Sequence, residues 1–221
     1  MLHPEAALSP RFAWFMLAAS LAVFLFLSVT APSGAFEAAE RSFLLALRNG
    51  DDPALLNGPG WLLYFVQNIT ALGGWPVLTV FSLLLAGALI IHKQWSFLFV
   101  LLAVVIGETV ITGMLKDFFG RVRPDFLPHL TAASSESFPS GHSASAAAIY
   151  LTFGLAIANV LKQRAARRYA LGASLVLVFL IGASRVFLGV HYPTDVIAGW
   201  CVGAAWASAV WLAAWRLNNN A

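Results

Sequence analysis

Charged side chains are scarce in this chain. Of its 221 residues only 10% are Asp, Glu, Lys or Arg, whereas 60% are hydrophobic and the mean hydropathy is +0.79. Ordinary soluble domains are only about 45–50% apolar, so the composition excludes that class. A hydrophilic stretch long enough for a second domain is also missing. Residues 1–221 are therefore expected to form a single membrane-embedded domain.

Other shortages limit the function. Cys201 is the only cysteine and lies in an apolar run, so it cannot form an intramolecular disulfide and is interpreted as a small packing residue. The formal net charge is only +3, from 13 basic and 10 acidic residues dispersed along the chain, which does not predict nucleic-acid binding. No His-Glu-x-x-His or paired-carboxylate pattern occurs, so neither a metal nor a cofactor is predicted. Nothing in the sequence indicates an oligomeric state.

Long apolar runs make up most of the chain. A helix needs ~20 apolar residues to cross a bilayer. The runs that approach this length lie at residues 12–31, 75–91, 95–115, 141–161, 169–187 and 195–215. The predicted fold class is therefore an all-α integral membrane protein with six transmembrane helices. The first run could instead be a cleaved signal peptide, but it exceeds the usual ~7–15-residue apolar core, which favours a retained span. In the last run, Gly199, Gly203 and Ala207 form a small-residue stripe for helix packing.

The segment between the first two crossings has a different pattern. Its charged residues are Glu37, Glu40, Arg41 and Arg48, and they fall within roughly 100° of a helical wheel. Residues 36–49 are therefore predicted to form a helix that lies at the membrane interface. Residues 61–72 are too short to cross the bilayer alone and end at a pair of glycines. The sequence leaves open whether residues 61–73 insert.

The distribution of basic residues predicts the orientation. With six crossings, the N-terminus, the 92–94 turn, the 162–168 loop and the C-terminus share one side of the membrane. That side holds the densest basic loop, at residues 162–168, which indicates the cytoplasm. We therefore expect a multi-pass protein of the cell (inner) membrane. The polar motifs at the other ends of the crossings should face the periplasm or exterior.

Three polar motifs interrupt the apolar runs. They are Lys116 with Arg123, then Pro139-Ser140-Gly141-His142, then Ser184-Arg185 through His191 to Asp195. Serine before an apolar run is a helix N-cap whose side chain can accept a first-turn N–H, and glycine lets a ligand approach the backbone. A helix N-terminus binds anions through its free N–H groups and its dipole. Cations directed at this position indicate a phosphate site.

These motifs resemble those of a known family. Lys116-x6-Arg123-Pro124, Pro139-Ser140-Gly141-His142 and Ser184-Arg185-x5-His191-x3-Asp195 are similar to the three motifs of the type 2 phosphatidic acid phosphatase (PAP2) family. That family includes bacterial undecaprenyl-diphosphate and phosphatidylglycerophosphate phosphatases, glucose-6-phosphatase and the vanadium haloperoxidases. Every motif position matches, in order, between residues 116 and 195.

The cations suit phosphate chemistry on physical grounds. A phosphomonoester dianion repels nucleophiles, so its equatorial oxygens must be neutralised as the bond breaks. Lys116, Arg123 and Arg185 are candidates for this role without a metal, because Arg binds phosphate in a bidentate manner and Lys supplies a point charge. The backbone N–H groups of Ser140 and Gly141 are expected to assist them.

His191, His142 and Asp195 are the candidate catalytic residues. Asp195 can accept the Nδ1–H of His191 and leave Nε2 free to attack phosphorus, although an Asp at this position could also be only a helix cap. The resemblance implies that His191 forms a phosphohistidine intermediate. It also implies that His142 is the general acid, a task that suits a histidine pKa near ~6.5.

Two further charged residues lie outside the motifs. Arg121 is interpreted as a surface or lipid-headgroup residue.

Glu108 lies in the middle of a predicted crossing, where carboxylates are rare. It lies eight residues before Lys116, roughly 12 Å along a helix. Glu108 either pairs with a cation below the site or is protonated within the packing, and the sequence does not decide between these roles.

The sequence predicts a metal-independent membrane phosphatase that acts on a lipid phosphate or diphosphate at the outer face. Undecaprenyl diphosphate, phosphatidylglycerophosphate, phosphatidate and lipid A phosphate are all compatible with the motifs. The alternative is a membrane protein that only binds or transports an anion or lipid phosphate, but such a protein would not require two histidines and an aspartate beside the cations. Haloperoxidase chemistry is disfavoured because it needs vanadate and those relatives are soluble.

Overall fold

The computed structural model describes residues 8–219, and within this range it consists of helices without a β-strand. In chain order the helices are α1 (Pro10–Thr30), α2 (Glu37–Ala46), α3 (Trp61–Ala71), α4 (Trp75–Ile91), α5 (Trp95–Phe119), α6 (Gly141–Val160), α7 (Arg164–Phe187) and α8 (Pro193–Asn219). The predicted all-α class is confirmed.

Within residues 8–219, five helices are long and apolar enough to cross a membrane, namely α1, α5, α6, α7 and α8. A sixth span exists if α3 and α4 are taken together, because they form an apolar pair bent by 46° at Gly73-Gly74. Helix α4 has 17 residues and spans only about 26 Å at 1.5 Å per residue, which is less than the ~30 Å hydrocarbon core. Helix α4, predicted as a crossing by itself, is therefore shorter than the hydrocarbon core, and it forms a candidate span only together with α3.

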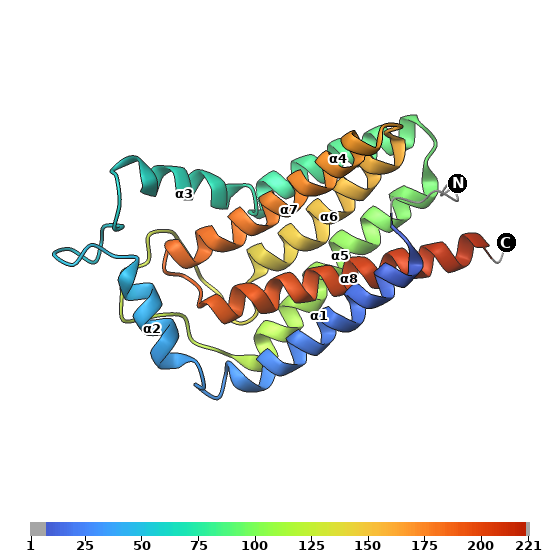
Figure 1. The fold of residues 1–221 in the computed structure, drawn as a ribbon. Coiled ribbons are helices and arrows are strands. Elements are labelled where there is room, and N and C mark those ends of the chain that lie inside the picture. The colour runs from blue at the N-terminus through green and yellow to red at the C-terminus, as the bar shows by residue number, and fades with distance from the viewer. Residues whose placement is uncertain (1–7, 220–221) are drawn as a thin grey trace.

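Helix α6 lies among α5, α7 and α8 in the bundle (Figure 1). Its contact with α8 is very close: a Cβ atom built on Gly203 would lie 2.2 Å from the Ala144 carbonyl oxygen, and one on Gly199 would lie 2.5 Å from the Ser140 oxygen. The predicted small-residue stripe of α8 therefore does pack on a neighbouring helix. This contact brings the start of α8 against the start of α6.

The two ends of the bundle differ. At one end lie the start of α1, the end of α8 and the turns that join α4 to α5 and α6 to α7 (Figure 1). At the other end lie α2, α3, the loop of residues 120–140 and the connection from α7 to α8. All three polar motifs meet at this second end, as the count of crossings predicts.

Helix α2 differs from the prediction in which side chains it buries. Glu40 is 4% exposed and lies inward with Leu44, and Arg48, which follows the end of the helix, is 5% exposed. The apolar side chains of Phe43 and Leu45 lie on the outside instead, 52% and 42% exposed. The charged stripe from which an interfacial helix was predicted therefore does not face outward at Glu40 and Arg48. They point inward because partners from distant segments lie beneath the helix.

Candidate active site

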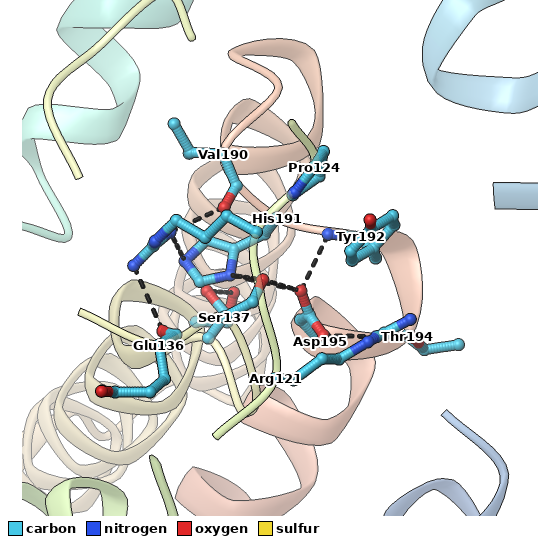
Figure 2. Close-up of polar contacts among 12 residues, drawn as sticks. Arg121, Pro124, Glu136, Ser137, Val190, His191, Tyr192, Thr194 and Asp195 are labelled. Carbon is cyan, nitrogen blue, oxygen red and sulfur yellow. Dashed lines mark hydrogen bonds and ion pairs between the residues drawn. The ribbon is translucent and has the colours of Figure 1, made fainter. Parts of the chain in front are cut away.

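His191 lies in the short connection between α7 and α8 and is 1% exposed. Its Nε2 atom is 3.0 Å from Nη1 of Arg123. Its Nδ1 atom is 3.5 Å from Oδ2 of Asp195 and 3.4 Å from Oγ of Ser137. Figure 2 shows the ring beside Ser137 and Asp195. Because the guanidinium only donates, it marks Nε2 as the acceptor nitrogen and Nδ1 as the one that carries hydrogen.

The surroundings keep His191 neutral. Burial lowers the pKa of its imidazole from about 6.5 to about 3, and the charges of Arg123 and Arg185 add to that effect. Asp195 acts in the opposite direction without compensating fully. At neutral pH the ring therefore carries a lone pair on one nitrogen, which is the state that a nucleophile requires.

The Asp195 carboxylate is completely buried and accepts hydrogen bonds on both oxygens. Oδ2 accepts the backbone N–H of Tyr192 at 2.9 Å and the hydroxyl of Ser137, and Oδ1 accepts Nη1 of Arg121 at 2.6 Å (Figure 2). The Tyr192 bond is a helix-capping bond, because Asp195 lies in the first turn of α8. The two roles that the sequence analysis weighed for Asp195, cap and histidine partner, are therefore compatible.

The prediction for Arg121 is wrong. Its side chain is only 11% exposed, and it forms ion pairs with Asp195 at 2.6 Å and with Glu40 at 2.7 Å. It also stacks over the ring of Tyr192 at 4.2 Å. Burial alone would lower the pKa of Arg121, but the two carboxylates raise it. Sequence reasoning missed this network because Glu40 is 81 positions away and lies in a helix predicted at the membrane interface.

The other cations converge near the loop of residues 120–140. Arg123 donates to the carbonyl oxygens of Ser135 and Val190, both at 2.6 Å, and to that of Glu136 at 3.3 Å. Lys116 also donates to the Glu136 carbonyl. These main-chain contacts fix the positions of the two positive groups, of which Arg123 also contacts His191.

The start of α6 is only partly as predicted. Ser140 is the N-cap, but its side chain makes no capping bond and its hydroxyl accepts from Ser143 at 3.0 Å. The backbone N–H of Ser140 donates to the Asp195 carbonyl oxygen at 2.9 Å, so it is already used. The first N–H to bond within the helix is that of Ala144, which leaves the N–H groups of residues 141–143 ahead of the helical ladder. A Cβ on Gly141 would lie 3.6 Å from Cε of Lys116, so the lysine extends across this helix start.

His142 lies between the α6 start and the break between α3 and α4. A Cβ on Gly73 would be 3.4 Å from Cδ2 of His142, and one on Gly74 would be 3.8 Å from its Nε2. His142 also interacts electrostatically with His191, Lys116, Arg123 and Arg185, so the fold brings the predicted site residues together.

Arg185 is 3% exposed, and its Nη1 donates to Oγ1 of Thr70 in α3 at 3.0 Å. Its Nε atom is one of three buried side-chain polar atoms without a hydrogen-bond partner in the described part of the chain. A buried guanidinium with an unused donor suits an anionic ligand. The sequence did not predict that Thr70 accepts a hydrogen bond from Arg185, since nothing in the local sequence distinguishes this threonine.

Glu108 has hydroxyl partners. It is 1% exposed and accepts from Thr112 and from Ser145, both at 2.8 Å. None of the ion pairs within residues 8–219 involves it, which favours the packing role over a cation partner. In the same range no three His, Cys, Asp or Glu side chains are grouped as metal ligands.

The PAP2 superfamily model matches residues 93–219. Phosphatidylglycerophosphatase B of Bacillus subtilis is 37% identical over 68% of this chain and 74% of that protein. Lipid A 1-phosphatase of Rhizobium etli is 35% identical over 47% of this chain and 44% of that protein. A crystal structure of a transmembrane PAP2-type phosphatidylglycerolphosphate phosphatase from Bacillus subtilis matches with a TM-score of 0.78 and 29% identity, over 93% of this chain and 97% of that one.

Proposed function

We propose, on the premise that this chain belongs to the PAP2 superfamily, that it removes a terminal phosphate from a lipid phosphate or diphosphate through a phosphohistidine on His191. Family membership makes the chain a phosphoric ester hydrolase, and the lipid phosphatases among its relatives place it with that group. The hydrolase therefore takes precedence over the non-enzymatic alternative. The observation that carries the mechanism is the His191 ring, with Arg123 at Nε2 and Asp195 behind Nδ1.

In the first step the Nε2 lone pair of His191 attacks phosphorus, a P–N bond forms and the P–O bond to the lipid breaks. His142 gives its proton to the departing oxygen, so the lipid leaves as an alcohol, or as a monophosphate if the substrate is a diphosphate. In the second step His142 takes a proton from water, the resulting hydroxide attacks phosphorus, and the P–N bond breaks. Inorganic phosphate and neutral His191 are restored.

The cations stabilise the charge on phosphorus. Lys116, Arg123 and Arg185 are the three groups proposed to hold the equatorial oxygens, with first-turn N–H groups of α6. The N–H of Gly141 fits this role, whereas Ser140 is restricted to its hydroxyl because its own N–H is used by Asp195. The unused Nε of Arg185 supports the assignment.

The substrate is proposed to be a membrane lipid because the site lies at one end of apolar helices, at the level where a lipid headgroup is found. Phosphatidylglycerophosphate, lipid A phosphate, undecaprenyl diphosphate and phosphatidate remain the candidates. The side chains that would select among them lie in α2, α3 and the loop of residues 120–140. A panel of these substrates in one detergent, with chelator present, measures the preference.

The two histidines are distinguished by the leaving group. His142→Ala should lose about 10²–10⁴-fold in rate on a lipid phosphate, the usual share of general acid catalysis, and much less on an aryl phosphate whose anion leaves unprotonated. His191→Ala should be inactive on both. Acid-labile, base-stable phosphate should be trapped on wild type or His142→Ala alone. Rescue of His191→Ala and not of His142→Ala by the aryl substrate would reverse the assignment.

The face of the membrane is tested separately. In a Cys201→Ala background, Ala133→Cys and Ala165→Cys are probed on intact cells with an impermeant thiol reagent. Labelling at position 133 and none at 165 is expected for a site on the periplasmic or outer face. The reverse pattern would place the site in the cytoplasm.

A further inference from the structure

Two charged residues outside the three motifs contact the site from its outer edge. Glu40 comes from α2 and Arg121 from the loop after α5, and both are largely buried. We propose that Glu40 and Arg121 act as a positioning pair that holds the Asp195 carboxylate toward His191. This inference rests on the proposed function, in which Asp195 orients the nucleophile.

The geometry links the residues in series. Nη2 of Arg121 donates to Oε2 of Glu40 at 2.7 Å, and Nη1 donates to Oδ1 of Asp195 at 2.6 Å. The other Glu40 oxygen accepts the backbone N–H and the hydroxyl of Thr194, at 2.9 and 2.6 Å. One planar guanidinium therefore joins two carboxylates and fixes the angle of each, which a lysine could not do with a single point charge.

The charges show why Glu40 is needed. Asp195 stabilises positive charge on the His191 ring as Nε2 bonds to phosphorus. An unbalanced arginine 2.6 Å from Asp195 would neutralise much of that effect. Glu40 balances Arg121, so the pair is neutral as a unit and Asp195 keeps its negative charge for His191. Arg121 then fixes the orientation of the Asp195 carboxylate, and Glu40 offsets the positive charge of Arg121. The negative charge of Asp195 therefore remains available to stabilise the His191 ring.

A purely mechanical role is the competing explanation, since the same bonds anchor α2 to the bundle. The two roles differ in their effect on turnover. An anchor affects the stability of the fold and the shape of the substrate site, and thus KM. A positioning pair affects the transition state without touching substrate, and thus kcat.

The test compares Glu40→Gln and Arg121→Gln with Glu37→Gln, a matched change at an exposed position of the same helix. Glu40→Gln keeps an amide oxygen for Thr194 but turns an NH2 group toward Arg121. In purified protein with a lipid phosphate and chelator, kcat should fall about 10–100-fold in the first two variants, the usual effect of a lost hydrogen bond to a charged group. KM should stay unchanged, and Glu37→Gln should equal wild type.

Two further variants sharpen the result. Arg121→Lys should recover only part of kcat, because Lys pairs with one carboxylate at a time. Glu40→Gln/Arg121→Gln should be no slower than Arg121→Gln, because Glu40 acts through the arginine. If Arg121→Gln does not fold, Glu40→Gln decides alone, with its thermal midpoint and its trapped phosphohistidine measured beside kcat.

Wild-type kcat in Glu40→Gln, or a loss confined to KM and thermal midpoint, overturns the positioning pair. Failure of the proposed function has a different signature. Asp195→Asn would then be as active as wild type, or His191→Ala would still form acid-labile phosphoprotein. A low kcat in Asp195→Asn together with full activity in both Glu40→Gln and Arg121→Gln would overturn only the inference made here.

Discussion

The protein buries carboxylates in two regions, and it treats them in opposite ways. At the site end, Asp195 and Glu40 share the guanidinium of Arg121 at 2.6 and 2.7 Å. In the middle of the bundle, Glu108 accepts hydrogen bonds only from the hydroxyl groups of Thr112 and Ser145. Burying an isolated charge is costly, so a carboxyl with hydroxyl partners alone suits a neutral acid, and one with an arginine suits an anion. The difference indicates that Asp195 and Glu40, and not Glu108, can act as negative charges at the site.

The strongest way to sharpen this comparison is to make the same isosteric change in both regions. Asp195→Asn should lower kcat about 10⁴-fold, because an amide favours the wrong tautomer of the histidine. The variant should fold, since Asn keeps the shape and an acceptor for the Tyr192 N–H. Phosphate release by the purified variant measures the loss. Activity within tenfold of wild type would mean that Asp195 is only a helix cap.

Removal of the shared cation should have the largest effect on stability. Arg121→Ala leaves two carboxylates buried without a counter-charge, which should cost about 3–5 kcal/mol in the free energy of unfolding. Arg168→Ala is the control, because Arg168 is exposed near the start of α7, far along that helix from Arg185 of the site, and it should change stability by less than about 0.5 kcal/mol. Denaturant titration in one detergent compares them. Equal stability of the two variants would contradict a charged Glu40–Arg121–Asp195 network.

The buried histidine should give a pH-dependent effect of intermediate size. Between about pH 6.5 and pH 3 the unfolded chain protonates His191 and the folded chain does not, because the pKa is lowered to about 3 in the fold. The contribution to stability is therefore complete above pH 6.5, and it falls by up to about 1.4 kcal/mol per pH unit as the solution becomes more acidic. His191→Gln should flatten this part of the stability profile. If wild type and variant lost stability with equal slope below pH 6.5, His191 would not be the group responsible for the pH dependence.

The smallest effect on stability and turnover is expected at Glu108, the carboxyl in the middle of the bundle. Glu108→Gln keeps an acceptor and gains a donor for the two hydroxyl partners, so stability should change by less than about 1 kcal/mol and kcat should stay near the wild-type value. Thermal midpoints and turnover of the two variants, Glu108→Gln and Asp195→Asn, are measured side by side. A large loss of kcat in Glu108→Gln would break the contrast and indicate a charged Glu108.

The sequence predicted the parts of the site that depend on local order. The three motifs mark the cations and histidines directly, and the glycines of α8 predict its close packing on α6. The partners that the sequence did not reveal come from distant segments: Glu40 in α2, Thr70 in α3 and Ser137 in the long loop. An amphipathic pattern indicates that a helix has a polar side, but it does not say whether water or a buried arginine lies against that side.

The Ser140 backbone shows the same limit at a smaller scale. Its place before an apolar run correctly predicts a helix start, yet the prediction of a free N–H failed. The Asp195 carbonyl occupies that group at 2.9 Å, and only the packing of α8 on α6 brings it there.

The contact of Gly199 with the Ser140 carbonyl also constrains how this sequence can vary over evolution. Gly199 lies in the second turn of α8, has no side chain of its own to offer the site, and is not one of the motif residues. Any larger residue would place its Cβ 2.5 Å from that oxygen and force α8 away from α6. Ser140 makes this contact and also donates its N–H to the Asp195 carbonyl oxygen, so the shift would separate two of the three motifs. Natural selection on catalysis therefore extends to a residue whose only contribution is to lack a side chain.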